Sequence, residues 1–172
     1  GVVCVPINLL WKHGELAYVL EHARVRGAVV TQAMQAQFLT GVAPTQALRE
    51  VFTIGDTGVP DAWPAALERV AFERLAQGQP TSVPVLTIED RAPISYLYTS
   101  GTTSTPKGVV GSHLAIYLEA LGTAVDTGLT ANDRVLAMMP MFHTAQLNAI
   151  CTPVVAAGGT LVVRLGFDAE GL

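Results

Sequence analysis

Short apolar runs alternate with amphipathic segments along most of the chain. The apolar runs predict strands over residues 2–7, 28–31, 51–56, 94–99, 134–139 and 159–164. In the amphipathic segments apolar residues recur every three or four positions, as in Leu16, Val19, Leu20 and Ala23. Because strands that alternate with helices build parallel sheets from βα units, we predict an α/β fold with a mainly parallel sheet flanked by helices.

The same spacing predicts five helices and some of their ends. They run from Glu15 to about residue 26, over 34–39, from Pro64 to about Gln77, and through 114–121 and 147–154. Gly27 is expected to stop the first helix. Pro64 fits a first helical turn, which tolerates proline, and Ser112 is placed to cap the helix after it. Pro153 predicts a kink in the last helix.

The segment GQPTSVP, residues 78–84, is the strongest linker candidate. It divides the chain into a first βα portion, residues 1–80, and a second portion, residues 81–172, with nearly all of the candidate chemistry. The chain begins inside a strand-like run and its last residues, GFDAEGL, start a new helical pattern. We therefore interpret both portions as parts of one larger domain.

Composition and charge narrow the class of partner. Half of the 172 residues are hydrophobic and 14% are charged, below the ~25% that is typical of soluble domains. This favours a well-buried parallel sheet, or surfaces that further chain covers. The net charge of -4 and the lack of a basic cluster disfavour nucleic acid and anionic membranes, and no apolar run is long enough to span a bilayer. We expect neither a nucleic-acid partner nor a transmembrane segment.

The two cysteines, Cys4 and Cys151, lie far apart in apolar segments and match no metal-ligand spacing. We interpret them as buried free thiols in a reducing compartment, and so expect a cytoplasmic protein without a metal site of its own.

Candidate binding groups are most concentrated in YLYTSGTTSTPKGVV, residues 96–110. Six of the seven residues from Thr99 to Thr105 carry a hydroxyl, and the seventh is Gly101. A strand followed by a glycine-containing loop lets backbone N–H groups converge on an anion, and hydroxyls add donors without bulk. Lys107 adds a positive charge in a chain whose only other lysine is Lys12. The stretch therefore predicts a phosphate-binding loop.

Two other interpretations apply to this loop. A Walker A motif that starts at Gly101 would need glycine where Pro106 stands and Ser or Thr where Gly108 stands, so that pattern fails twice. A threonine-rich loop can also be a polar surface turn. The buried strand before the loop and the Lys-Gly pair after it favour the anion site instead.

The stretch YTSGTTSTPKGVVGSH, residues 98–113, resembles the phosphate-binding signature of the adenylate-forming superfamily, YTSGTTGxPKGVxxSH. That superfamily includes acyl-CoA synthetases, luciferases and peptide-synthetase adenylation domains. Residues 5–23 and 139–163 are similar to the segments that flank the signature in acyl-CoA ligases. The resemblance implies a fragment of the large N-terminal domain of an acyl-CoA synthetase-like enzyme.

The resemblance also implies a reaction and a binding loop. A carboxylate attacks the α-phosphate of ATP to give an acyl-adenylate and pyrophosphate, and the acyl group then passes to coenzyme A; Mg²⁺ accompanies ATP. Fixed dipoles and a cation stabilise the charge on the departing pyrophosphate, so Lys107 is the implied catalytic residue. Ser104 stands where the family commonly has glycine. The implied phosphate contacts are Thr99, Ser100, Gly101, Thr102, Thr103, Ser104, Lys107 and Gly108.

The stretch PMFHT, residues 140–144, matches a segment that borders the acyl pocket in acyl-CoA ligases, which implies pocket roles for His143 and Thr144. A lone histidine is also often a hydrogen-bonded structural group, and we interpret His13, His22 and His113 in that way. If Gln146 and Asn148 face the pocket, they make part of its wall polar and favour a shorter or functionalised acid.

Two alternative functions stay open. A related ligase would load the acyl group onto a carrier protein, and a noncatalytic nucleotide-binding or interaction domain could keep the loop alone. The family's segments for adenine, ribose and magnesium, and the catalytic lysine of its small C-terminal domain, have no match in these residues. We therefore expect this chain to hold part of an active site and to be inactive alone.

Overall fold

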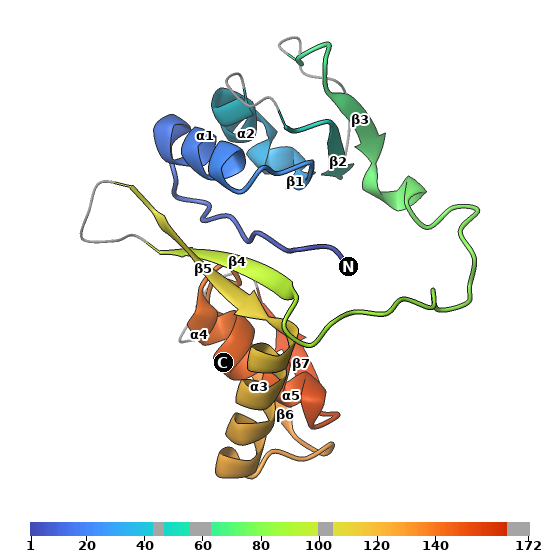
Figure 1. Ribbon diagram of the computed structural model, residues 1–172, viewed down its shortest axis with the longest axis vertical. Helices are drawn as coiled ribbons and strands as arrows, with labels where there is room; N and C mark the ends of the chain where they lie inside the picture. Colours follow the sequence, from blue (N-terminus) through green and yellow to red (C-terminus); the bar gives the residue numbers. More distant parts are fainter. Residues whose placement is uncertain (43–46, 56–62, 100–104, 165–172) are drawn as a thin grey trace. The chain divides into compact units, whose positions relative to one another are not determined.

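The computed structural model describes residues 1–42, 47–55, 63–99 and 105–164 (Figure 1). Contacts divide the chain into two compact units. The first, called here the α1 unit, comprises residues 9–86 and 98–107. The second, called here the α3 unit, comprises residues 1–8, 87–97 and 108–172.

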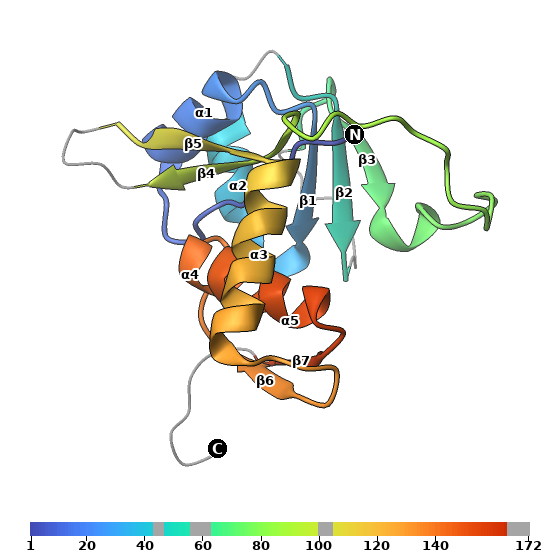
Figure 2. The same ribbon diagram turned by 60° about the horizontal axis from the view of Figure 1, so that its bottom comes forward.

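The sheet of the α1 unit has three strands in the order β1 (Gly27–Thr31), β2 (Glu50–Ile54) and β3 (Glu68–Ala71). All neighbours are parallel, and Figure 2 shows the three strands running in one direction. In this register Val29 lies opposite Phe52, and Phe52 lies opposite Val70. The parallel sheet and its helices confirm the predicted α/β class.

Two helices of the α1 unit pack on each other and cover part of this sheet. α1 (His13–His22) buries Leu16, Val19 and Leu20, as the spacing predicts. α2 (Gln35–Val42) follows a 3-10 turn (Gln32–Met34) and contacts both α1 and β1. At Gly41 a Cβ atom would lie 2.6 Å from Leu16 Cγ, so glycine is required where the two helices approach.

Two predictions from the sequence are wrong in this unit. The segment predicted as a helix from Pro64 forms β3 and a 3-10 turn (Phe72–Arg74), because pairing with β2 outweighs the local helical pattern. Gly27 does not stop α1 but begins β1. The chain leaves the helix instead at Arg24, whose φ of 50° lies in the left-handed region.

In the α3 unit the N-terminal run predicted as a strand is reduced to one bridge between Cys4 and Ser95. Cys4 N–H donates to Ile94 O at 2.9 Å, and Tyr96 N–H donates to Cys4 O at the same distance. Ser95 lies in β4 (Pro93–Thr99), which pairs with β5 (Lys107–Ser112), a strand that the apolar pattern did not predict. Cys4 is exposed, so its interpretation as a buried thiol was wrong.

α3 (His113–Thr127) begins where the sequence predicts, because Ser112 Oγ accepts a hydrogen bond from Ala115 N–H at 3.2 Å. Gly128, at φ 69°, ends the helix in the left-handed conformation. β6 (Arg134–Ala137) and β7 (Thr160–Val163) form a parallel pair at the predicted positions.

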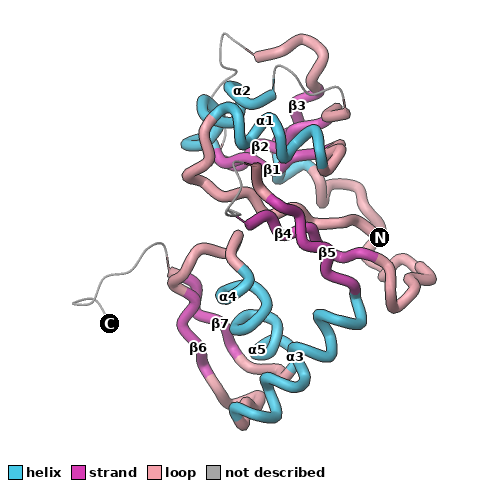
Figure 3. Tube along the Cα trace, turned by 60° about the vertical axis from the view of Figure 1, so that its left-hand side comes forward, coloured by secondary structure: helices cyan, strands magenta, loops and turns pink. Residues whose placement is uncertain are grey.

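Between β6 and β7 lie α4 (Thr144–Gln146), a π-helical turn (Leu147–Cys151) and α5 (Thr152–Ala156). The predicted helix over 147–154 is thus divided, and Pro153 lies in the first turn of α5, where proline is tolerated. α3 packs on the π-helical turn and on α5 (Figure 3), and Ala120, Cys151 and Val154 are buried in this unit.

Candidate functional site

The hydroxyl-rich loop joins the end of β4 to the start of β5. Thr99 is the last residue of β4 and Lys107 is the first residue of β5, followed by Gly108. All three are exposed, whereas Pro106 is buried. The predicted contacts Ser100, Gly101, Thr102, Thr103 and Ser104 lie outside the described residues. The strand ends therefore present one hydroxyl and one ammonium group to solvent at the two ends of the loop.

Several aromatic side chains of the α1 unit pack around Tyr98, the residue before Thr99. Tyr98 Oη lies 2.6 Å from His22 Nδ1, and the two rings meet edge to face with centroids 5.8 Å apart. Trp11 packs edge to face on Tyr98 at 6.3 Å, and Tyr18 stacks on His22 at 5.2 Å. These contacts fix the end of β4 to α1. Tyr98 lies in the signature, but its contacts with α1 could not be predicted, because its partners are distant along the sequence.

Two of the remaining histidines form hydrogen bonds within their own units. His13 Nδ1 is hydrogen-bonded to Thr40 O within the α1 unit. The backbone N–H of His113 donates to Ala92 O at 3.1 Å at the start of α3. The ring contact agrees with the structural interpretation of His13, whereas the backbone contact leaves the role of the His113 ring a prediction.

β5 approaches β4 closely at Gly111, after the loop. A Cβ atom at Gly111 would lie 2.8 Å from Ser95 Oγ and 3.3 Å from Ile116 Cδ1. Ser95 is buried. A larger residue at position 111 would therefore push β5 away from β4, so this glycine, at a position that the signature leaves open, shapes the strand pair that carries the loop.

The second predicted segment follows β6. His143 caps α4: its Nδ1 accepts a hydrogen bond from Ala145 N–H at 3.2 Å, and the side chain is exposed. A neutral ring that accepts at Nδ1 carries its proton on Nε2. His143 can therefore donate a hydrogen bond from Nε2 to an acceptor such as a carboxylate. Thr144 is also exposed, and its Oγ1 accepts from Asn148 Nδ2 at 3.1 Å.

Gln146 and Asn148 are buried. Gln146 Oε1 accepts a hydrogen bond from Met139 N–H at 2.9 Å, and its Nε2 donates to Cys151 Sγ at 3.2 Å. Both the oxygen and the nitrogen of the Gln146 amide are thus hydrogen-bonded within the segment. The expectation that Gln146 adds polarity to a pocket wall is therefore not met.

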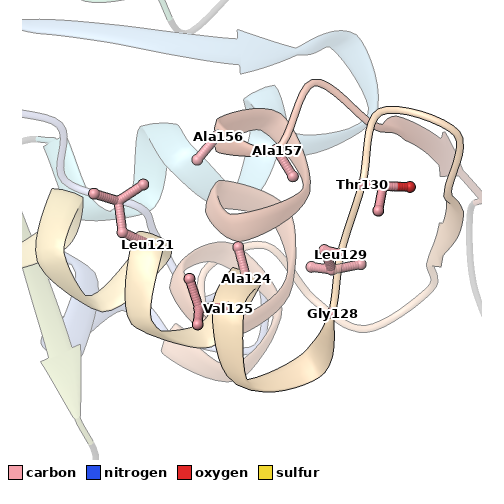
Figure 4. A pocket seen from close by; sticks show the side chains of 8 residues that line it. All are labelled: Leu121, Ala124, Val125, Gly128, Leu129, Thr130, Ala156 and Ala157. Carbon is pink, nitrogen blue, oxygen red and sulfur yellow. The ribbon is translucent and has the colours of Figure 1, made fainter.

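A groove of about 330 Å³ lies elsewhere in the α3 unit, between α3, α5 and the turn after α3 (Figure 4). Its lining is apolar except for the hydroxyl of Thr130, and it contains no predicted site residue and no titratable side chain. The groove is therefore not a site for acid–base chemistry. It is lined by Leu121, Ala124, Val125, Gly128, Leu129, Thr130, Ala156 and Ala157.

Beside this groove Asp133 holds the turn that leads into β6. Its Oδ2 accepts from Thr130 Oγ1 at 2.8 Å and from Thr130 N–H at 2.7 Å. The side-chain hydrogen bond, followed by the backbone one, lowers the pKa of Asp133 below its ordinary value. Asp133 is half-buried, and its carboxylate stabilises this turn.

Thr99 and Lys107, at the two ends of the loop, belong to the α1 unit. Gly108 and the segment with His143 belong to the α3 unit. Among the described residues no group of three or more His, Cys, Asp or Glu could hold a metal ion. In the same part of the chain no helix combines the length and apolarity needed to cross a membrane.

The chain matches a family model and several known proteins. The model of the AMP-binding enzymes matches residues 1–170. Over 165 residues the chain is 30% identical to 4-hydroxybutyrate–CoA ligase 2 from Metallosphaera sedula, and the match covers 94% of this chain and 30% of that ligase.

Two solved structures share the fold at low identity. The first is an anthranilate CoA ligase in complex with anthranoyl-AMP, with a TM-score of 0.83 and 25% identity over 98% of this chain and 31% of that one. The second is a long-chain-fatty-acid–CoA ligase from Archaeoglobus fulgidus, with a TM-score of 0.81 and 26% identity over 96% of this chain and 31% of that one. The chain spans about a third of the length of these relatives.

Proposed function

Because the chain belongs to the family of AMP-binding enzymes, as the signature at residues 98–113 predicts, we propose that the whole protein is an ATP-dependent acid–thiol ligase of the acyl-CoA synthetase type. It converts a carboxylic acid and ATP into an acyl-adenylate and pyrophosphate, and then transfers the acyl group to coenzyme A. The observation that carries this proposal is the signature loop, which joins the exposed Thr99 at the end of β4 to the exposed Lys107 at the start of β5.

In this proposal the loop binds the β- and γ-phosphates of ATP. Backbone N–H groups and hydroxyls donate to the phosphate oxygens, and Lys107 offsets the charge that grows on the departing pyrophosphate. Mg²⁺ bound to ATP would neutralise further phosphate charge. The residues assigned to this role are Thr99, Ser100, Gly101, Thr102, Thr103, Ser104, Lys107 and Gly108.

The acid is proposed to bind beside His143 and Thr144. This segment follows β6, and loops at the carboxyl ends of parallel strands are where open α/β sheets bind ligands. The Nε2–H of a neutral His143 is suited to donate to a substrate carboxylate, because Nδ1 already accepts from Ala145.

The named relatives favour coenzyme A over a carrier protein as the acceptor, since each is a CoA ligase. The two free cysteines, Cys4 and Cys151, support a reducing compartment, and we assign the protein to the cytoplasm on that basis. Residues 1–80 and 81–172 are proposed to belong to one larger domain, with the rest of the active site in further parts of the whole protein.

The test is product analysis with the whole protein. It is incubated with ATP, Mg²⁺ and short, hydroxylated, aromatic or long-chain acids, with and without coenzyme A, and the products are identified by mass spectrometry. We expect acyl-AMP without coenzyme A and acyl-CoA with it. ATP hydrolysis that does not depend on any acid, with neither product formed, would contradict the proposal.

A further inference from the structure

Gln146 is fully buried in the segment that carries His143. Burying a primary amide removes it from water, which is unfavourable unless the amide forms hydrogen bonds inside the protein. A methionine or leucine would fill a similar volume without this cost. The use of glutamine at this position therefore points to a role for its hydrogen bonds.

Those hydrogen bonds join the two ends of one short segment. Gln146 Oε1 accepts from the backbone N–H of Met139 at 2.9 Å, at the start of the turn that leads to His143. Gln146 Nε2 donates to Cys151 Sγ at 3.2 Å, at the end of the π-helical turn. Cys151 Sγ in turn lies 3.6 Å from Met141 Sδ, back in the first turn. The amide thus holds residues 139–141 against the π-helical turn.

The backbone around Gln146 holds His143 directly. The carbonyl oxygen of His143 accepts from Gln146 N–H at 3.2 Å and from Leu147 N–H at 3.1 Å. His143 N–H donates to Pro140 O at 3.1 Å. The π-helical turn follows at once, and such turns are rare in proteins and frequent at functional sites. His143 is therefore held from both sides by the elements that Gln146 links.

We propose that Gln146 is a positioning residue for the acid site: it fixes the turn over residues 139–143 and so orients His143, without touching the substrate. This inference rests on the proposed function, and specifically on His143 as a group that meets the acid. It predicts that the segment is already ordered before the acid binds, which avoids the entropy of ordering it on binding.

The test compares two variants of the whole protein. Gln146→Met removes both hydrogen bonds of the amide at similar volume. Gln35→Met is the matched control, because it makes the same change at a buried glutamine of α2, outside this segment. We expect Gln146→Met to raise the KM for the acid about tenfold, since the buried hydrogen bonds that hold the turn are lost. The KM for ATP should stay within about twofold, as should both constants of Gln35→Met.

Two readouts separate positioning from simple loss of stability. If the rise in the acid KM were equal in both variants, or absent from Gln146→Met, the inference would be overturned. Amide hydrogen exchange at Met139 in the unmodified protein needs no variant to fold: without acid we expect slow exchange, and exchange at the rate of an unprotected amide would also overturn the inference. A protein with no acid-dependent activity at all would instead overturn the proposed function, and this inference with it.

Discussion

Lys107 is one of the two lysines of the chain, and its side chain is exposed where β5 leaves the signature loop. In the whole protein Lys107→Ala should slow pyrophosphate release about a hundredfold, because a transition-state charge contact contributes roughly 3 kcal/mol. Rapid-quench measurement of pyrophosphate tests this expectation. Lys12→Ala is the matched control, since it removes the other lysine and the same charge.

A rate for Lys107→Ala equal to that of Lys12→Ala at limiting ATP would remove Lys107 from the phosphate site. A slow Lys107→Ala beside a normal Lys12→Ala would show that the position of the charge matters, and not the net charge of the protein.

His143 is the residue whose loss should change acid selection. His143→Ala removes the Nε2 donor and also the cap of α4 at Ala145 N–H. We expect the KM to change unevenly across a panel of acids, while the KM for ATP stays within about twofold. Steady-state kinetics with each acid measure this. His13→Ala, which removes a histidine bonded to Thr40 O, is the control.

Equal losses for every acid, together with a large ATP defect, would show that His143 does not belong to the acid site. The same pattern in His13→Ala would point to a general loss of folded protein.

At the scale of elements, the hydrophobic spacing predicted those segments whose own residues form the core. α1 buries Leu16, Val19 and Leu20 at the expected positions, and β2 buries Val51 inside the sheet. The start of α3 was predictable because a cap needs only Ser112 and the backbone that follows it. Each of these features depends on residues that are close together in the chain, so a single sequence is enough to predict them.

The failures at β3 and β5 have a common physical cause, which is that each segment becomes a strand only beside its partner strand. Val109 and Val110 of β5 are exposed, so no buried stripe marks that strand, and β4 alone specifies it. The sequence of β3 has a helical pattern, and its pairing with β2 makes it a strand. The same distinction applies to the polar residues. The signature loop can be recognised in the sequence, because its residues are consecutive. The hydrogen bond between Gln146 and Met139 could not be predicted, because it forms only in the folded turn.

The turn before β6 gives a prediction about pH. Thr130 donates to the Asp133 carboxylate through its hydroxyl and its N–H, and this lowers the pKa of Asp133 in the folded protein. A lowered pKa means that the interaction stabilises the fold above the unfolded pKa and is lost as the pH falls through the folded value. The stability difference between wild type and Asp133→Ala should therefore be constant near neutral pH and shrink below the ordinary value of 3.8.

Thermal unfolding of wild type and Asp133→Ala between pH 2 and pH 7 measures this difference. A difference that stays constant to the lowest pH would show that the carboxylate charge does not stabilise the turn.

At the scale of the whole molecule, we propose that this chain supplies part of a larger catalyst. It covers about 30% of 4-hydroxybutyrate–CoA ligase 2, and the resemblance predicts that the family's adenine, ribose and magnesium segments lie outside these residues. Positioning of reactants contributes up to roughly 7 to 11 kcal/mol to such reactions. The 172 residues alone should therefore form no acyl-adenylate at a detectable rate, even if the loop binds triphosphate weakly.

The most direct test of acyl-adenylate formation is the exchange of labelled pyrophosphate into ATP, measured for the whole protein with and without each acid. The Lys107→Ala variant of the whole protein, the 172-residue chain and the Lys107→Ala variant of that chain are measured beside it. We predict exchange by the whole protein only when a suitable acid is present, and exchange by the 172 residues no greater than that of the variant. Exchange that is absent from the whole protein with every acid, or unaffected by Lys107→Ala in the whole protein, would contradict acid activation at this loop.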